Sequence, residues 1–220
     1  MKIAREGYPF AAAGLLLAAA GWTAAYLRVG GLAAEIAAGS VSGLAVFVLW
    51  FFRDPEPEIP SDEGLVVAPG QGKILLIEDV EEDTFMAGPA RKITIFLSVF
   101  DVHVQRAPVS GTVAYKVYKP GAYAVAWLEK ASNDNEQSSL GITTPNGPVL
   151  VRQIAGLIAR RIITDPSEGD TVERGRRFGL IRFGSRVDLF LPRDWEVLCS
   201  VGDRVRVGSS ILARQSSRAA

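Results

Sequence analysis

The sequence predicts a mainly β protein of the α+β class, in which a compact β-rich domain follows an N-terminal transmembrane helical hairpin. Two observations support this fold class. The N-terminal quarter of the chain holds two long apolar runs with almost no charged residues. The rest holds short runs rich in Val, Ile, Thr, Leu and Phe between turn sequences, without the alternating strands and long helices of α/β folds. We assign residues 1–52 to a membrane anchor, 53–64 to a linker and 65–220 to the β-rich domain.

Each apolar run is long enough to cross a bilayer. Residues 7–27 carry no charge and residues 29–52 carry only Glu35, whereas about 20 apolar residues of helix span a hydrocarbon core. The alternatives are a cleaved signal peptide, a single span, or two helices lying in the interface. A second run directly after the first favours the hairpin, which returns the chain to its starting side. Lys2 and Arg5 favour the cytoplasm for that side, so we expect a cell-membrane protein with a cytoplasmic domain.

Beyond the anchor, prolines and acidic side chains in RDPEPEIPSDEG predict a stiff, solvated linker, and strands follow it. The strand-like runs are GLVVAPG (64–70), KILLIEDV (73–80), RKITIFLSV (91–99), GTVAYKVY (111–118), GITTPNGPVLVRQIAG (141–156) and RFGLIRFGSRVDLFLP (177–192). Asn146-Gly147 predicts a tight hairpin turn, because both residues tolerate positive φ. Short helices are expected only within 121–139 and 155–165.

The composition excludes several kinds of site. Cys199 is the only cysteine and His103 the only histidine, so an internal disulfide, a cysteine-rich metal site and a multi-histidine metal site are excluded. Lys+Arg and Asp+Glu balance at 24 each, so no nucleic-acid partner held by bulk charge is expected. Catalysis must then rest on one histidine, on carboxylates, on hydroxyls, or on a group that the chain makes from its own residues.

The pair Gly184-Ser185 interrupts the last strand-like run, where glycine weakens a strand unless backbone must come close to another group. The nucleophile elbow G-x-S-x-G is absent there. An internal reaction is open to this pair: the serine hydroxyl attacks the preceding carbonyl, and elimination cuts the chain and leaves a pyruvoyl group. Its ketone can form a Schiff base with a substrate amine and act as an electron sink for decarboxylation. The pair alone is not specific, because Gly208-Ser209 is a second one.

Six blocks in sequence order resemble the short, membrane-associated form of phosphatidylserine decarboxylases. The blocks are EGYPF (6–10), FFRDPEPEIP (51–60), FLSVFDVHVQRAPVSG (96–111), KASNDNEQ (130–137), QIAGLIARRI (153–162) and GRRFGLIRFGSRVDLFLP (175–192). The resemblance implies autocatalytic cleavage between Gly184 and Ser185. The fragment from Ser185 to Ala220 would carry the covalent pyruvoyl cofactor and stay associated with the remainder.

The resemblance also implies the reaction: decarboxylation of a membrane phospholipid, phosphatidylserine, to phosphatidylethanolamine and CO2 in phospholipid biosynthesis. A carboxy-lyase with such a substrate is served by an anchor in the lipid bilayer. It implies no nucleic-acid partner and no metal, and it leaves room for a homo-oligomer.

Two further site residues follow from the resemblance. His103 occupies the family's histidine position, as a general acid that reprotonates the decarboxylated carbon or a base in self-cleavage. Arg106 stands where some relatives carry a second histidine. It is expected either to bind the lipid phosphate or substrate carboxylate, or to form a structural ion pair. Asn133, Asp134 and Asn135 are expected either to line the pocket or to form a polar turn.

One departure from the family pattern concerns self-cleavage. Gln71, in APGQGKI, stands at the place of a family aspartate that assists the histidine and serine, and glutamine cannot accept a proton at neutral pH. Asp101, two residues before His103, is expected to share a strand face with it and could compensate. Asp188 is a second candidate. The alternative function is therefore an unprocessed, non-catalytic lipid-binding relative anchored in the membrane, and a third option is an unrelated membrane-tethered β domain.

Overall fold

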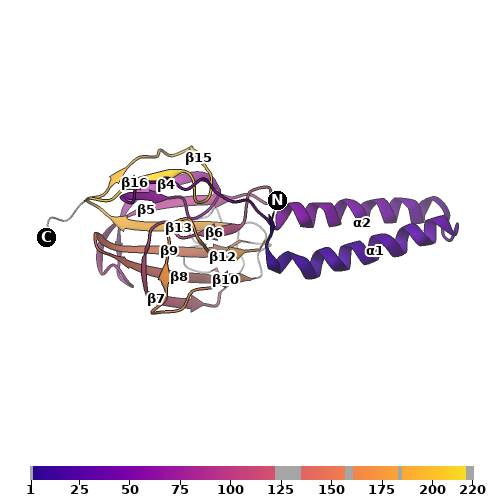
Figure 1. Cartoon of the computed structure of the whole chain (residues 1–220), viewed down its shortest axis with the longest axis horizontal. Coiled ribbons are helices and arrows are strands. Elements are labelled where there is room, and N and C mark those ends of the chain that lie inside the picture. Colours follow the sequence, from indigo (N-terminus) through magenta and orange to yellow (C-terminus); the bar gives the residue numbers. More distant parts are fainter. Residues whose placement is uncertain (1, 122–134, 157–160, 183–184, 217–220) are drawn as a thin grey trace. The chain divides into compact units, whose positions relative to one another are not determined.

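The computed structural model describes residues 2–121, 135–156, 161–182 and 185–216. The chain divides into two compact units, Met1–Glu56 and Pro57–Ala220. The first is a hairpin of apolar helices and the second is β-rich (Figure 1), so the predicted fold class is confirmed. Short helices are expected within 121–139 and 155–165, and parts of both ranges lie outside the described residues. Asn133, Asp134 and Gly184 also lie outside them.

The N-terminal unit holds α1 (Tyr8–Tyr26) and α2 (Gly31–Phe51), which run side by side (Figure 1) after the short 3-10 helix η1 (Arg5–Gly7). By length and composition both helices can cross a membrane. Strand β1 (Lys2–Ile3) pairs with β2 (Arg53–Asp54), so the two ends of the hairpin meet. The chain thus enters and leaves the hairpin at the same end, as the two apolar runs predict.

Small residues let the two helices approach closely. A Cβ added to Gly14 would lie 2.9 Å from the Cβ of Ala45, and one added to Gly21 would lie 3.0 Å from the Cβ of Ala38. In a membrane such contacts supply the packing that large apolar side chains supply in water. The alanine- and glycine-rich composition of the runs is therefore the sequence signal for the helix interface.

The second unit is built from short antiparallel strands. They are β3 (Leu65–Val67), β4 (Gly72–Glu82), β5 (Gly88–Leu97), β6 (Val104–Arg106), β7 (Gly111–Lys119), β8 (Gln137–Thr144), β9 (Gly147–Ala155), β10 (Ile162–Thr164), β11 (Thr171–Val172), β12 (Arg177–Ile181), β13 (Ser185–Pro192), β14 (Glu196–Val197), β15 (Arg204–Val205) and β16 (Ile211–Arg214).

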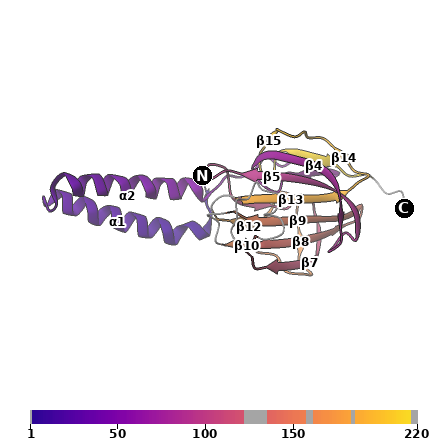
Figure 2. The same ribbon diagram turned by 180° about the vertical axis from the view of Figure 1, so that it is seen from behind.

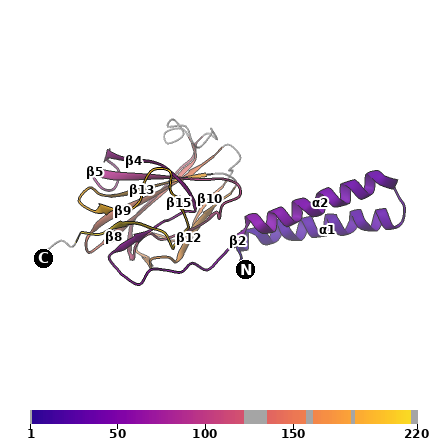
Figure 3. The same ribbon diagram turned by 90° about the horizontal axis from the view of Figure 1, so that it is seen from above.

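Within the described ranges the strands form one large and two small sheets. The large sheet has the order β11-β7-β8-β9-β13-β5-β4-β15 (Figure 2), and the small sheets have the orders β10-β12-β6 and β14-β16-β3. The large sheet curls (Figure 3), and side chains of its inner face share one core with side chains of both small sheets. The main core lies on this inner face and includes Val187, Leu189 and Leu191 of the central strand β13.

The run 177–192 is not one interrupted strand. It divides into β12, which belongs to a small sheet, and β13, which belongs to the large one. Strand β12 ends at Ile181 and β13 begins at Ser185, so Ser185 is the first residue after the change of pairing partner.

The outer face of the large sheet carries buried charges. On β13, Arg186 donates two hydrogen bonds to Asp188, at 2.7 and 2.9 Å, and Thr94 donates a third at 3.0 Å. The Asp188 carboxylate is therefore bound by Arg186 and Thr94 on the face opposite to Val187. Asp188 therefore forms its ion pair on the outer face of β13. Ser185 and Val187, which alternate with Arg186 and Asp188 along the strand, face the interior.

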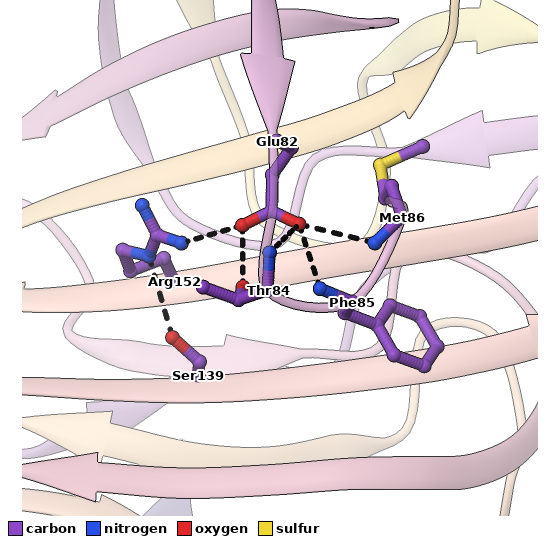
Figure 4. Close-up of polar contacts among 6 residues, drawn as sticks. All are labelled: Glu82, Thr84, Phe85, Met86, Ser139 and Arg152. Carbon is purple, nitrogen blue, oxygen red and sulfur yellow. Dashed lines mark hydrogen bonds and ion pairs between the residues drawn. The ribbon is translucent and has the colours of Figure 1, made fainter. Parts of the chain in front are cut away.

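The side chain of Glu82 connects the β4–β5 hairpin to Arg152 on the same outer face (Figure 4). The carboxylate accepts hydrogen bonds from the amides of Phe85 and Met86, at 2.9 and 3.0 Å, and from Thr84. It also forms an ion pair at 2.9 Å with Arg152. Burial alone would raise the pKa of Glu82, but these hydrogen bonds and the Arg152 charge hold it below its ordinary value of 4.5.

We expect Glu82→Gln to destabilise the domain by about 3 kcal/mol at pH 7, because it breaks a buried ion pair and leaves the Arg152 charge behind. A depressed carboxyl pKa contributes stability above the unfolded value, and this contribution disappears as pH falls through the folded pKa. The difference between wild type and variant should therefore shrink below pH 4.5. Thermal unfolding in detergent at neutral and acid pH measures it, with the exposed Glu81→Gln as the control. Equal stability of the variant and wild type at pH 7 would contradict this role.

Candidate active site

Ser185 lies at the end of the large sheet where β13 begins. It pairs with Ala155 on β9 and Leu97 on β5, so hydrogen-bonded strands hold its main chain on both sides. Its side chain is fully buried, and its Oγ has no hydrogen-bond partner among the described residues. Buried hydroxyls are nearly always hydrogen-bonded, so a buried hydroxyl without a partner among the described residues indicates a chemical role for Ser185.

His103 lies directly before β6, in the small sheet that faces the large one. Its Nδ1 lies 3.0 Å from the carbonyl oxygen of Asp101. A carbonyl only accepts hydrogen bonds, so Nδ1 carries the hydrogen and Nε2 is the basic nitrogen. The His103 carbonyl accepts from the amide of Ile181, at the end of β12. The only histidine is therefore fully buried, held in one tautomer, and tied to the strand that leads toward Ser185.

Asp101 orients His103 through its main chain. Its carboxylate accepts hydrogen bonds from the amide and hydroxyl of Ser98, at 2.9 and 2.8 Å, and lies 3.9 Å from a guanidinium nitrogen of Arg204. Asp101 and His103 do not share a strand, because β5 ends at Leu97 and the chain turns before β6. The Asp101 carboxylate caps that turn.

Gln71 is held at the same end of the large sheet by its two neighbouring glycines. A Cβ added to Gly72 would lie 1.9 Å from the carbonyl oxygen of Phe96, and one added to Gly70 would lie 3.4 Å from Val187. Only glycine permits the approach at position 72, whereas the Gly70 contact is an ordinary one. The backbone next to Gln71 therefore lies against Phe96 and Leu97, and Leu97 is a pairing partner of Ser185, so Gln71 stands near this strand end without supplying a carboxylate.

Arg106 points away from this end of the interior. Its guanidinium donates a hydrogen bond to the carbonyl of Gly175 at 3.1 Å, and its Cδ would lie 3.0 Å from a Cβ added to Gly208. Side chains alternate along a strand, so Arg106 and its neighbour Gln105 face opposite sides. The contact of Arg106 with Gly175 is structural. Binding of substrate by Arg106 stays a prediction.

Polar side chains that sequence reasoning passed over line the interior near Ser185. Gln153 accepts a hydrogen bond from Thr164, which also bonds to Ser138 at 2.7 Å. Gln105 of β6 is fully buried. The sequence signal for such residues is a polar side chain at an inward-facing position of an otherwise apolar strand. In VLVRQIA, Gln153 lies two residues after Val151 and therefore points to the same face of the strand.

Glu136 joins the two sheets beside the pairing partner of Ser185. Its main-chain carbonyl accepts from the amide of Ala155 at 2.9 Å, and its Oε1 accepts from Tyr118 and from the Ile162 amide at 3.0 and 3.3 Å. Over the described ranges its second carboxylate oxygen has no hydrogen-bond donor. Asn135, next to it, donates to the Ala155 carbonyl at 2.7 Å.

Comparison with known proteins identifies the family. Residues 44–213 match the family model described as phosphatidylserine decarboxylase. A protein of Symbiobacterium thermophilum named phosphatidylserine decarboxylase proenzyme is 50% identical over 214 residues, which cover 96% of this chain and 95% of the relative. A protein of the same name from Azorhizobium caulinodans is 47% identical over 217 residues, which cover 97% of this chain and 89% of that one. This chain therefore belongs to the phosphatidylserine decarboxylase family, whose members are carboxy-lyases.

Proposed function

We propose that this protein is a self-processing, pyruvoyl-dependent enzyme that converts phosphatidylserine to phosphatidylethanolamine and CO2 at the cell membrane. The observation that carries the proposal is Ser185. It is the first residue of a central strand, it is fully buried, and its hydroxyl has no hydrogen-bond partner in the described part of the chain. A structural serine would be hydrogen-bonded, whereas a serine that reacts with the preceding carbonyl must keep its oxygen available.

In the proposed maturation, Ser185 Oγ attacks the carbonyl carbon of Gly184 and the peptide C–N bond breaks, which leaves an ester. The Cα proton of residue 185 then departs and the Cβ–Oγ bond breaks, which releases Gly184 as a carboxylate and leaves an enamine at residue 185. The enamine takes up a proton at Cβ to give an imine, and one water hydrolyses the imine to a ketone and ammonia. His103 supports the proton transfers, because its Nδ1 is occupied by Asp101 and its Nε2 is basic.

The surroundings of residue 185 fit a pyruvoyl group, which keeps the three carbons of the serine it comes from. The group would stay in place because Ala155 and Leu97 pair with residue 185 on either side. The ketone supplies an electrophile that takes up the substrate amine and accepts electrons as CO2 leaves. Burial excludes bulk water from the site, and we assign to His103 the proton delivered to the carbon that lost CO2.

The anchor suits a lipid substrate. Helices α1 and α2 can each cross a bilayer by length and composition. Both ends of the hairpin meet at the β1–β2 pair, which supports an anchor that returns the domain to the side where it started. We place that side in the cytoplasm, because Lys2 and Arg5 flank the first helix.

The reaction is tested by incubating the purified full-length protein with vesicles that contain phosphatidylserine. We expect phosphatidylethanolamine and CO2 in equal amounts, and loss of both after treatment with hydroxylamine, which captures ketones. Product formation that survives hydroxylamine would contradict the pyruvoyl group. No product from cleaved, folded protein would contradict the substrate.

The two fragments should stay associated without a covalent bond. The fragment from Ser185 to Ala220 supplies β13, which lies between β5 and β9 in the large sheet and pairs with both. We expect both fragments in one peak in gel filtration without denaturant, and their separation only in denaturant. Release of the small fragment under native conditions would contradict the proposed arrangement.

A further inference from the structure

Gln105 is the most conspicuous unused polar side chain in the interior. It is fully buried, and within the part of the chain that the structure describes neither its Nε2 nor its Oε1 has a hydrogen-bond partner. A buried amide without partners costs about 1–3 kcal/mol. Such a group is rarely kept in a native interior without a use.

The strand pairing fixes the direction in which Gln105 points. Gln105 pairs with Gly179 on β12, and directly paired residues of antiparallel strands project to the same side. A Cβ added to Gly179 would lie 3.1 Å from Nε2 of Gln153. Gln105 therefore projects toward Gln153.

That side is the one where Ser185 lies. Gln153 pairs with Val187 on β13, and Ser185 stands two residues before Val187, on the same face of the strand. His103 stands two residues before Gln105 and is buried like it. The Gln105 amide thus faces the interior side on which the proposed reactive residue and the only histidine lie.

The neighbouring amide in this interior behaves differently. Gln153 donates to the carbonyl of Ile163 at 3.4 Å and accepts from Thr164, so it is satisfied within the protein. The contrast separates a structural glutamine from one whose hydrogen-bonding groups are left for another molecule.

We propose that Gln105 binds the serine headgroup of the substrate and selects for it; this rests on the proposed function. An amide presents an acceptor and a donor side by side, and the headgroup presents an amine and a carboxylate on the same carbon. Oε1 would accept from the amine and Nε2 would donate to the carboxylate. A neutral donor orients the carboxylate without the strong ground-state stabilisation of an arginine pair, which would oppose loss of CO2.

The test compares Gln105→Leu with Gln153→Leu in the full-length protein. For Gln105→Leu we expect complete self-cleavage by intact mass, a Tm equal to or above wild type, and a 10- to 100-fold lower kcat/KM for phosphatidylserine. Most of the change should be in KM, because the hydrogen bonds exist before CO2 leaves. Gln105→Asn, which keeps the amide, should recover part of the loss. Gln153→Leu should lower the Tm, because it breaks bonds made within the protein.

Three results would overturn the assignment. Gln105→Leu with wild-type kcat/KM would show that the amide does not touch the substrate. A lower Tm with unchanged kcat/KM would make Gln105 structural, and an uncut Gln105→Leu chain would move its role to self-cleavage. Failure of the proposed function is distinguishable, because wild-type protein would then itself lack cleavage or product.

Discussion

Replacing Ser185 with alanine should leave the chain in one piece and abolish decarboxylation. Alanine has no hydroxyl to attack the Gly184 carbonyl, so neither the ester nor the ketone can form. Since the Ser185 Oγ makes no hydrogen bond to any described residue, the stability of Ser185→Ala should stay within about 0.5 kcal/mol of wild type. Intact mass, the Tm and turnover of phosphatidylserine measure the three effects.

The second Gly-Ser pair of the chain provides the matched control. Ser209 follows Gly208, as Ser185 follows Gly184. However, Ser209 lies in a turn, where its own amide donates a hydrogen bond to the Arg206 carbonyl. Ser209→Ala should be cleaved and active like wild type. Cleavage of Ser185→Ala at its normal position would refute the assignment of the nucleophile.

His103→Asn should lower the rate of decarboxylation by about 10²–10⁴-fold, the usual contribution of a general acid or base. Asparagine can keep the donor bond that Nδ1 makes to the Asp101 carbonyl, but it has no group equivalent to the basic Nε2. The domain should therefore remain folded while proton transfer fails. Intact mass over time reports self-cleavage, and turnover by the cleaved fraction reports decarboxylation.

Asp101→Asn is the control for His103. The structure connects the two residues through the Asp101 carbonyl, while the carboxylate caps the turn at Ser98. The substitution keeps the main chain and an acceptor oxygen, so its rate should stay within a few-fold of wild type. A loss as large as that of His103→Asn would instead make the carboxylate the partner that substitutes for the aspartate missing at Gln71.

The anchor and the strands could be predicted from sequence because both depend on local pattern. Nearly uncharged runs of about 20 residues predict spanning helices, and the alternation of Val187, Leu189 and Leu191 with Arg186, Asp188 and Phe190 predicts a strand. The strand is confirmed, but its predicted half-burial is wrong, because both faces of β13 are buried. The change of sheet between Ile181 and Ser185 could not be predicted. Strand partners depend on long-range pairing, and the run 177–192 has the same local composition whether it forms one strand or two.

The directions of the site residues escaped prediction for a related reason. Asp101 and His103 have the spacing of one strand face, but the chain turns between β5 and β6, so Asp101 contacts the imidazole through its carbonyl while its carboxylate binds Ser98. Arg106 and Gln105 are adjacent in a strand of three residues. Which of the two faces the interior depends on register with β12, which short strands do not encode. The blocks that resemble the family therefore provided the candidate site residues, and the strand pairing assigned each side chain to its face.

The most direct test of the central claim is the intact mass, under denaturing conditions, of freshly purified wild-type protein. We predict two species, residues 1–184 and residues 185–220, the smaller one carrying 36 of the 220 residues and a ketone in place of its N-terminal amine. This result would show that Gln71 does not block maturation. A single uncut chain that persists after long incubation would contradict the account and leave a lipid-binding relative without the cofactor.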